Sequence, residues 1–276
     1  MSQAVLPRNR KSAEPDRRPA PPALRIAAGA ARGADTLLTT LLALVLGLVF
    51  LYACFALWDT WRIYDDAGID ENLLQYKPQL DQEEGAGFAE LLAINPDVRA
   101  WLTLDDTQID YPVVQGTDNV KYVNTDVYGA FSLSGSLFLD YRNQSDFSDN
   151  YNLIYGHHME GGYMFGQLAD FAEPVFFDQH RTGTLYLPQK TYQVEIFACM
   201  QTDAYDAAIY NPGNLSEVQM DTLLSEVKDT AVQYREIGLT TQDHILALST
   251  CSDTATNART ILLGRLEEIS ATEGAA

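Results

Sequence analysis

The clearest chemical signal in this sequence is a cysteine at the end of an apolar segment. Residues 246–250 read LALST and run into Cys251, and a short polar loop separates them from RTILLGRL, which begins at Arg259. Both segments have the composition of β-strands. If they pair as antiparallel strands, Arg259 returns beside Cys251 at the mouth of the hairpin. A guanidinium there favours the thiolate and can donate hydrogen bonds to an oxyanion.

Both residues also have simpler interpretations. A lone cysteine at a strand end is more often a small buried hydrophobe than a nucleophile, and a lone arginine beside a loop is usually solvated. Arg265 competes with Arg259, because the alternation of side chains along a strand places both on one face. Arg259 ranks first, since Arg265 lies six residues further from the loop.

A pair of histidines is the second chemical signal. Residues 152–155 read NLIY, a strand-like run, and Gly156 permits a tight turn before His157 and His158. A cysteine nucleophile needs a group that protonates the leaving group, and histidine suits that task near neutral pH. A turn histidine with a structural hydrogen bond is the simpler alternative. The pair lacks the spacing of a metal site, and the sequence contains no motif for a cofactor.

Short strands separated by turns must position these groups. Eight strands in about 170 residues favour a closed barrel or a sandwich. A stretch with helical spacing, residues 215–235, interrupts the series, and Asn214 or Ser216 could cap it. The expected strands are 100–104, 111–115, 135–139, 152–155, 183–187, 192–200, 244–250 and 259–266.

Charge is divided unevenly along the chain. The net charge is −20, yet residues 1–57 carry seven basic and three acidic side chains. The remaining residues carry 11 basic and 35 acidic side chains. An acidic domain of this kind is a poor ligand for polyanions, which argues against nucleic acid as a partner.

Residues 37–57 contain no Asp, Glu, Lys or Arg. As a helix, this run would span about 30 Å, the thickness of a bilayer core. Basic side chains precede it and acidic ones follow it, so the N-terminus is expected in the cytoplasm and the domain outside. A cleaved signal peptide is the main alternative. The run is long for a signal peptide and lacks an Ala-x-Ala site near its end, so an uncleaved single-pass anchor in the cell membrane is favoured.

These features predict five segments. They are a disordered basic arm in the cytoplasm (1–36), a transmembrane anchor (37–57), an acidic helical linker (58–95), a catalytic domain (96–270) and a C-terminal tail (271–276).

Three strings around the candidate residues together resemble the sortase family, most closely its class B. They are YNLIYGHHMEGGYMF (151–165), LSTC (248–251) and RTILLGRL (259–266). The resemblance extends upstream through NPDVRAW, IDYPVVQ and GSLFLDYR, and covers about 170 residues. It implies a mainly β fold, an eight-stranded and mostly antiparallel barrel with N-terminal helices and a helix before the seventh strand.

The resemblance also implies roles for individual residues. Cys251 is the expected nucleophile, His157 the acid/base and Arg259 the oxyanion donor, with Ser249 and Thr250 supporting the site. Asn is common in the family where His158 stands. A free Cys251 also leaves Cys199 as a packed strand residue without a disulfide.

A sortase-type reaction is transpeptidation. Cys251 would cleave a C-terminal sorting signal of a surface protein and form a thioacyl enzyme. An amine of a peptidoglycan precursor or a pilin would then accept the acyl group. A surface cysteine peptidase acting mainly by hydrolysis and a non-enzymatic, membrane-tethered β-barrel that binds a partner remain as alternatives. A papain-like enzyme or cell-wall amidase fits less well, because these normally place the cysteine before the histidine in the chain.

Overall fold

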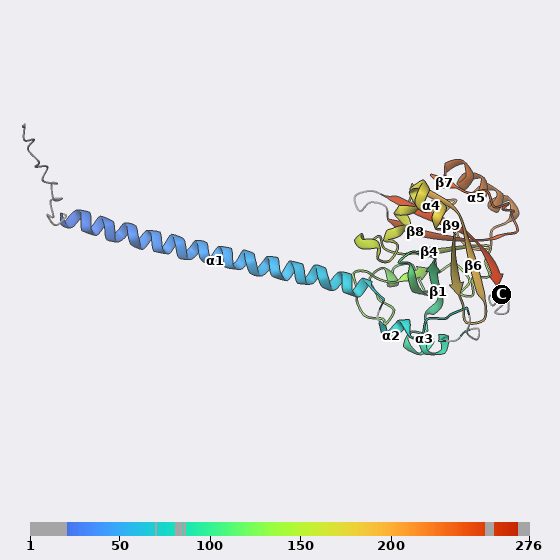
Figure 1. Ribbon diagram of the computed structural model, residues 1–276, viewed down its shortest axis with the longest axis horizontal. Helices are drawn as coiled ribbons and strands as arrows, with labels where there is room; N and C mark the ends of the chain where they lie inside the picture. Colours follow the sequence, from blue (N-terminus) through green and yellow to red (C-terminus); the bar gives the residue numbers. More distant parts are fainter. Residues whose placement is uncertain (1–20, 70, 81–84, 86, 252–256, 270–276) are drawn as a thin grey trace, which may run out of the picture. The chain divides into compact units, whose positions relative to one another are not determined.

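The computed structural model describes residues 21–69, 71–80, 85, 87–251 and 257–269 (Figure 1). The chain divides after Trp58 into an N-terminal helical unit and a C-terminal unit that contains all of the strands. The long helix α1 (Pro22–Ala67) includes the apolar run 37–57. Among the described residues it is the one helix long and apolar enough to cross a membrane.

The start of α1 differs from the sequence-based expectation. Residues 22–36 were expected to lack regular structure, but they form the first turns of the helix. This stretch is rich in alanine, the residue with the highest helix propensity, and Pro22 stands at the first helical position, where proline is tolerated. Residues 1–20 of the expected arm lie outside the described residues.

The C-terminal unit is a closed β-barrel. Its ring follows the order β5-β1-β2-β3-β4-β8-β9-β6, and pairing of β5 with β6 closes it. The β2–β3 and β4–β8 pairs are parallel and the others antiparallel. The strands are β1 (Val98–Leu104), β2 (Asp110–Val114), β3 (Leu137–Leu139), β4 (Tyr151–Tyr155), β5 (Thr182–Tyr186), β6 (Thr191–Asp203), β7 (Gln233–Tyr234), β8 (His244–Cys251) and β9 (Ala258–Ile269).

The predicted eight-stranded, mostly antiparallel barrel is confirmed. The one strand that the sequence did not predict, β7, has two residues and pairs with β6 outside the ring.

Residues 245–250 of β8 are buried on both faces of the strand, which explains its nearly continuous apolar sequence. Leu246 and Leu248 belong to one core cluster, which also contains Ala100, Leu139 and Ile154. Ile245 and Ala247 face a second cluster under helix α5. The strand that carries Cys251 is therefore held in the middle of the domain by apolar contacts on both sides.

Helix α5 (Glu217–Thr230) is the helix predicted before the seventh strand of the ring. Ser216 is its N-cap and forms a capping box with Gln219. Met220, Leu223 and Val227 bury the inner face of the helix in the second cluster. The expected helix reached residue 235, but the chain after Ala231 is extended and forms β7.

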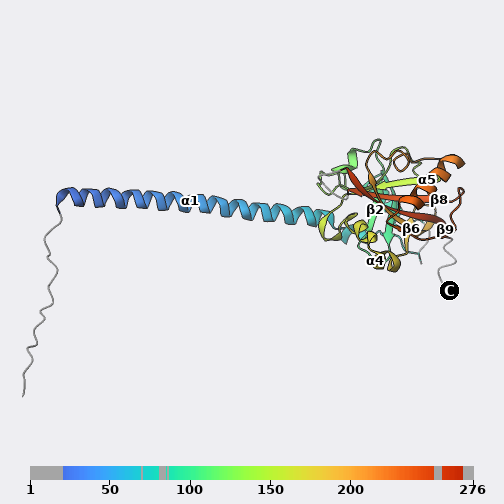
Figure 2. The ribbon, with the colours of Figure 1, turned by 90° about the horizontal axis from the view of Figure 1, so that it is seen from above.

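The remaining helices are short and cover other parts of the barrel. Figure 1 shows α2 and α3 on the side away from α4 and α5, and the second view separates α4 from α5 (Figure 2). They are α2 (Glu71–Leu74), α3 (Phe88–Ile94) and α4 (Pro174–Gln179), with the 3-10 helices η1 (Lys121–Val123), η2 (Glu160–Gly162) and η3 (Gly166–Ala172).

Candidate active site

The three candidate residues lie at one end of the barrel. In the β8–β9 ladder Cys251 pairs directly with Arg259, as the sequence predicted. Strand β4 runs parallel to β8, and Tyr155 at its end pairs with Ser249. The backbone N–H of Gly156 then donates to the carbonyl of Ser249 over 3.1 Å. Because neighbouring parallel strands end at the same end of the barrel, the turn that carries His157 follows β4 next to the end of β8.

A cavity of about 430 Å³ opens at this end of the barrel. His157, Arg259, Ser249 and Thr250 all line it, and all four were predicted site residues. The backbone of Cys251 is described, whereas the placement of its thiol lies outside the described part of the structure. The remaining residues that line the cavity are Asn119, Val123, Phe138, Tyr155, Gly156, Ala204 and Tyr210.

His157 is half-buried and held by the backbone. Its ring Nε2 lies 2.7 Å from the carbonyl oxygen of Val123, so the neutral ring donates its Nε2 proton there and leaves Nδ1 as the acceptor. His158 is exposed, does not line the cavity, and pairs through its backbone with Met164. The structure thus brings His157, and not His158, to the cavity.

Gly156 sets the direction of this turn. A Cβ at this position would come within 2.4 Å of Leu137 Cδ2 and 2.7 Å of Phe165 Cδ2, closer than real Cβ contacts. Only glycine leaves room for the core side chains beneath the turn. Its role is steric, and differs from the tight-turn flexibility expected from sequence.

Arg259 and Arg265 have different environments. Arg259 is half-buried in the cavity wall, and its Nη1 donates to the carbonyl of Ala258 over 3.0 Å. The guanidinium of Arg265 instead forms ion pairs with Glu195 and Glu267. It also donates to the carbonyl of Ile237. The ion pairs of Arg265 and its place near the other end of β9 separate it from Cys251.

Ser249 and Thr250 both line the cavity but differ in their hydrogen bonds. The hydroxyl of Ser249 lies 2.9 Å from the Tyr210 hydroxyl, which ties the end of β8 to the segment after β6. Thr250 faces Thr260 across the β8–β9 ladder. Within the described residues, the buried hydroxyl oxygens of both threonines have no hydrogen-bond partner.

Cys199 fits the packed strand residue that the resemblance implied. It is wholly buried in β6 and its thiol is free. Burial raises the pKa of this thiol to about 12, so it stays protonated at neutral pH.

The sequence did not reveal the aromatic wall of the cavity. The rings of Tyr155 and Tyr210 stack with their centroids 6.3 Å apart and their planes 6° apart. The ring of Phe138 also packs against Tyr155, and the centroids of these two rings are 5.2 Å apart. These residues come from β4, the β6–α5 connection and β3, so no local motif contains them. Tyr155 adjoins the Gly156–His157 turn, and that position was the available signal.

A buried acid lies behind this wall. Asp140 follows β3 and has no exposed surface. Burial by itself would raise the pKa of its carboxyl, but hydrogen bonds from Arg142, Asn119 and Tyr155 outweigh that effect and hold the pKa below its ordinary value. Burial and the nearby Asp140 carboxylate raise the pKa of Tyr155 well above its ordinary range. Asp140 is therefore ionised and Tyr155 neutral at physiological pH.

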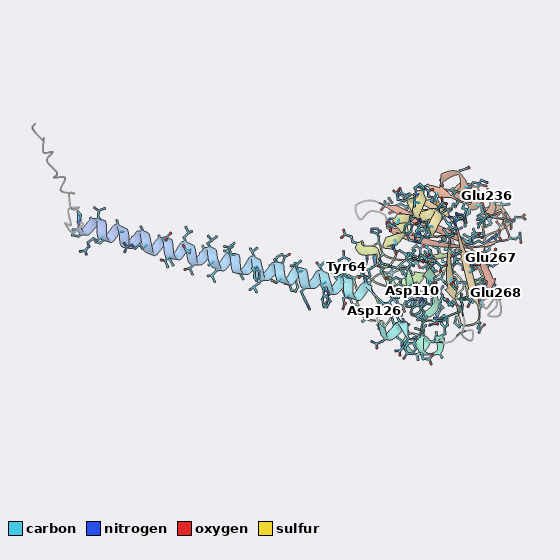
Figure 3. All side chains as sticks on the ribbon, in the orientation of Figure 1. Tyr64, Asp110, Asp126, Glu236, Glu267 and Glu268 are labelled. Atoms are coloured by element: carbon cyan, nitrogen blue, oxygen red, sulfur yellow. The ribbon has the colours of Figure 1, made fainter. Side chains whose placement is uncertain are left out.

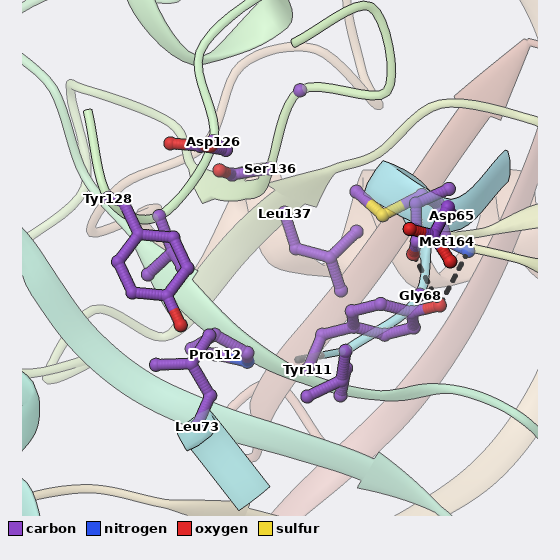
Figure 4. Close-up of a pocket in the computed structure, with 14 residues that line it drawn as sticks. Asp65, Gly68, Leu73, Tyr111, Pro112, Asp126, Tyr128, Ser136, Leu137 and Met164 are labelled. Carbon is purple, nitrogen blue, oxygen red and sulfur yellow. Dashed lines mark hydrogen bonds between the residues drawn. The ribbon is translucent and has the colours of Figure 1, made fainter. Parts of the chain in front are cut away.

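A second cavity, of about 590 Å³, shares none of its lining residues with the first (Figure 4). Asp65 and Asp126 are among the residues that line it. The hydroxyl of Tyr111 donates to the carbonyl of Ala67 and accepts from the backbone N–H of Met164. None of the predicted site residues lies in it.

Residues 102–267 match the model of the sortase domain. Among curated proteins, sortase B of Listeria monocytogenes is 35% identical over 164 residues, which cover 59% of this chain and 65% of that protein. Sortase B of Staphylococcus aureus is 29% identical over 185 residues, or 66% of this chain and 75% of the relative.

Solved structures of class B sortases are also similar to this chain. A Streptococcus pyogenes class B sortase involved in pilus biogenesis is 46% identical, with a TM-score of 0.61, and the match covers 67% of this chain and all of that one. A Staphylococcus aureus sortase B–substrate complex is 28% identical, with a TM-score of 0.64 and coverage of 68% and 88%. With its family match, barrel topology and class B relatives, this chain belongs to the sortase family of cysteine transpeptidases.

Proposed function

We propose that this protein is a membrane-anchored transpeptidase that cleaves a C-terminal sorting signal in surface proteins and transfers the acyl group to an amine. The observation that carries the proposal is that the backbone of Cys251 pairs with Arg259 at the end of the barrel where Arg259 and His157 line one cavity. The proposed substrate binds in the cavity that His157 and Arg259 line. The pilus-associated relative and the substrate complex of another class B sortase support a peptide substrate of this kind.

The proposed reaction has two acyl transfers. The Cys251 thiolate attacks a backbone carbonyl of the sorting signal, and Arg259 donates hydrogen bonds to the oxyanion that forms. His157 takes up the proton of the Cys251 thiol at Nδ1 and gives it to the departing amine as the C–N bond breaks, which leaves a thioacyl enzyme. An amine acceptor then attacks the thioester, loses its proton to His157 and releases the Cys251 thiolate. A peptidoglycan precursor and a pilin lysine are the acceptor classes proposed.

The proposed location follows from α1. Residues 37–57 form the membrane anchor, residues 1–36 stay in the cytoplasm and the domain from residue 96 lies outside. A charge-free run within a helix long enough to cross a bilayer supports this arrangement, together with the basic side chains that precede the run.

Trapping of the thioacyl enzyme by mass spectrometry tests the reaction. The purified protein is offered a library of sorting-signal peptides, and the adduct is mapped. We expect the adduct on Cys251 and none in Cys251→Ala, whereas Cys199→Ala retains it because Cys199 is buried in β6. Wild-type turnover by Cys251→Ala would refute a cysteine enzyme.

An amine titration separates transpeptidation from hydrolysis. With a primary amine added, a transpeptidase yields the aminolysis product in place of the free acid. Release of free acid alone, at every concentration of a triglycine or lysine acceptor, would favour the peptidase interpretation. A protein whose Cys251 neither acylates nor labels with an alkylating agent would be a binding module.

A further inference from the structure

Asp140 is a wholly buried acid, and each hydrogen-bond partner of its carboxylate either lines the catalytic cavity or bonds to a residue that does. Its Oδ1 accepts from Arg142 Nε over 2.8 Å and from the Arg142 backbone N–H over 2.9 Å. Its Oδ2 accepts from Arg142 Nη2 over 2.8 Å, from Asn119 Nδ2 over 2.8 Å and from the Tyr155 hydroxyl over 2.9 Å. A buried carboxylate is tolerated only when its oxygens are paired in this way.

Three separate segments of the cavity wall are tied to this one carboxylate. Asn119 precedes η1, and Tyr155 ends β4, and both line the cavity. Arg142, held by Asp140, also donates to the backbone carbonyl of Tyr210, over 3.1 Å. Tyr210 in turn stacks on Tyr155 and bonds to Ser249. Loss of the Asp140 charge would therefore release groups from all three segments at once.

A comparison with Asp149 separates this arrangement from ordinary buried polarity. Asp149 is 5% exposed and also accepts two hydrogen bonds through its carboxylate, from Asn143 Nδ2 and the Gln144 backbone N–H. Neither of these partners lines the cavity. The two acids are thus similar in burial and different in what they hold.

We propose that Asp140 is a positioning residue of the transpeptidase site, which fixes Tyr155, Asn119 and, through Arg142, the Tyr210 segment as a preformed wall for the acyl-donor peptide. The proposal rests on the function proposed above. Asp140 is not among the residues that line the cavity, so it acts through the lining residues that it binds. Its loss should weaken binding of the peptide and leave the reactivity of Cys251 intact.

The test compares Asp140→Asn with the matched control Asp149→Asn. For each full-length variant, kcat and KM are measured with the peptide that acylates the wild-type protein best, and Cys251 is alkylated with iodoacetamide. We expect about a tenfold rise in KM for Asp140→Asn, from the loss of charge-assisted hydrogen bonds. Its alkylation rate should stay within about twofold of wild type. Asp149→Asn should lower the melting temperature without raising KM.

A double variant adds a readout that simple destabilisation would not move. Tyr155→Phe removes one of the bonds to Asp140, so its effect on KM should largely disappear in the Asp140→Asn background. If Asp140→Asn does not fold, Arg142→Lys takes its place. Lysine keeps the charge but cannot hold both oxygens of Asp140 and reach the Tyr210 carbonyl, so its KM should also rise.

Two outcomes would overturn the proposal. One is an unchanged KM in Asp140→Asn, or in Arg142→Lys where that variant replaces it, and the other is a rise no larger than that of Asp149→Asn. Either result, with a wild-type protein that acylates normally, would refute the role of Asp140 and leave the proposed function standing. A wild-type protein that never acylates would refute the proposed function and the role of Asp140 with it.

Discussion

Two adjacent histidines with different environments give a sharp test at the scale of the residue. His157 lines the cavity and bonds through Nε2 to Val123, whereas His158 is exposed. We expect His157→Ala to lose peptide turnover by about 100-fold or more, the contribution of a general acid–base group. His158→Asn should retain wild-type turnover. Steady-state cleavage of the peptide measures both, and the reverse order of effects would assign the catalytic role to His158.

The two arginines of β9 allow charge to be separated from hydrogen-bond geometry. Arg259→Lys keeps the positive charge beside Cys251 but loses the planar fork of donors. Turnover should fall by about 100- to 1000-fold, as for loss of an oxyanion donor, while alkylation of Cys251 stays near the wild-type rate. Arg265→Lys, at the ion pairs with Glu195 and Glu267, should change neither quantity much.

Measurement of both rates on all three proteins decides between roles for Arg259. Equal losses in alkylation and turnover would mean that it acts through its charge alone. A larger defect in Arg265→Lys would move the oxyanion role to that residue.

Sequence reasoning proposed the candidate residues that stand next to a chemical motif, and missed the cavity residues that do not. The LSTC string led to Cys251, and the glycine-histidine turn led to His157. Asp140, Asn119 and Tyr210 belong to segments far apart in the chain, and only the barrel brings them together. In the sequence these three polar residues look like ordinary loop residues. Only the fold shows that Asp140 is wholly buried.

At the scale of the element, prediction followed the strength of the local pattern. The strand β8 was predicted over residues 244–250 and ends at Cys251, because its continuous apolar run is bounded by polar loops. The two residues of β7 carry too little pattern to predict, and their strand depends on pairing with β6. The end of α5 was misplaced for the same reason, since Val232–Arg235 keep helix-compatible side chains but pair with β6.

The turn between β4 and His157 supports a prediction at this scale. A methyl group at Gly156 would meet Leu137 and Phe165 in the core, so Gly156→Ala should lower the free energy of unfolding by about 1–3 kcal/mol. It should also reduce turnover, because relief of the clash moves His157. Chemical denaturation and peptide cleavage measure the two effects.

Gly68→Ala is the matched control, because its nearest new contact, 3.5 Å from the carbonyl oxygen of Asp65, is ordinary. Gly68→Ala should behave as wild type in both assays. A Gly156→Ala protein with full stability and activity would mean that the turn is not sterically constrained.

At the scale of the whole molecule, the distribution of charge bears on topology. The acidic side chains are spread over the C-terminal unit, as the labelled residues Asp110, Asp126, Glu236, Glu267 and Glu268 illustrate (Figure 3). The basic excess precedes the apolar run of α1. Positive side chains before a membrane helix favour retention of that end in the cytoplasm.

We therefore expect protease added to intact protoplasts to remove the catalytic domain and spare a tag at the N-terminus. Immunoblots for the tag and for the domain follow the two ends separately. Permeabilised protoplasts serve as the control, in which both ends should be digested. Protection of the domain in intact protoplasts would reverse the topology.

The register of the barrel also has a consequence for oxidative chemistry. Cys199 pairs with Leu262 on β9, which pairs with Leu248 on β8, so Cys199 lies two strands away from the strand of Cys251. Two strand spacings amount to about 10 Å, beyond the roughly 7 Å between Cα atoms that a disulfide spans. Cys199 is also buried in the core, and its thiol stays protonated. If Cys251 is oxidised to a sulfenic acid, Cys199 cannot resolve it, and recovery requires a thiol from outside the barrel.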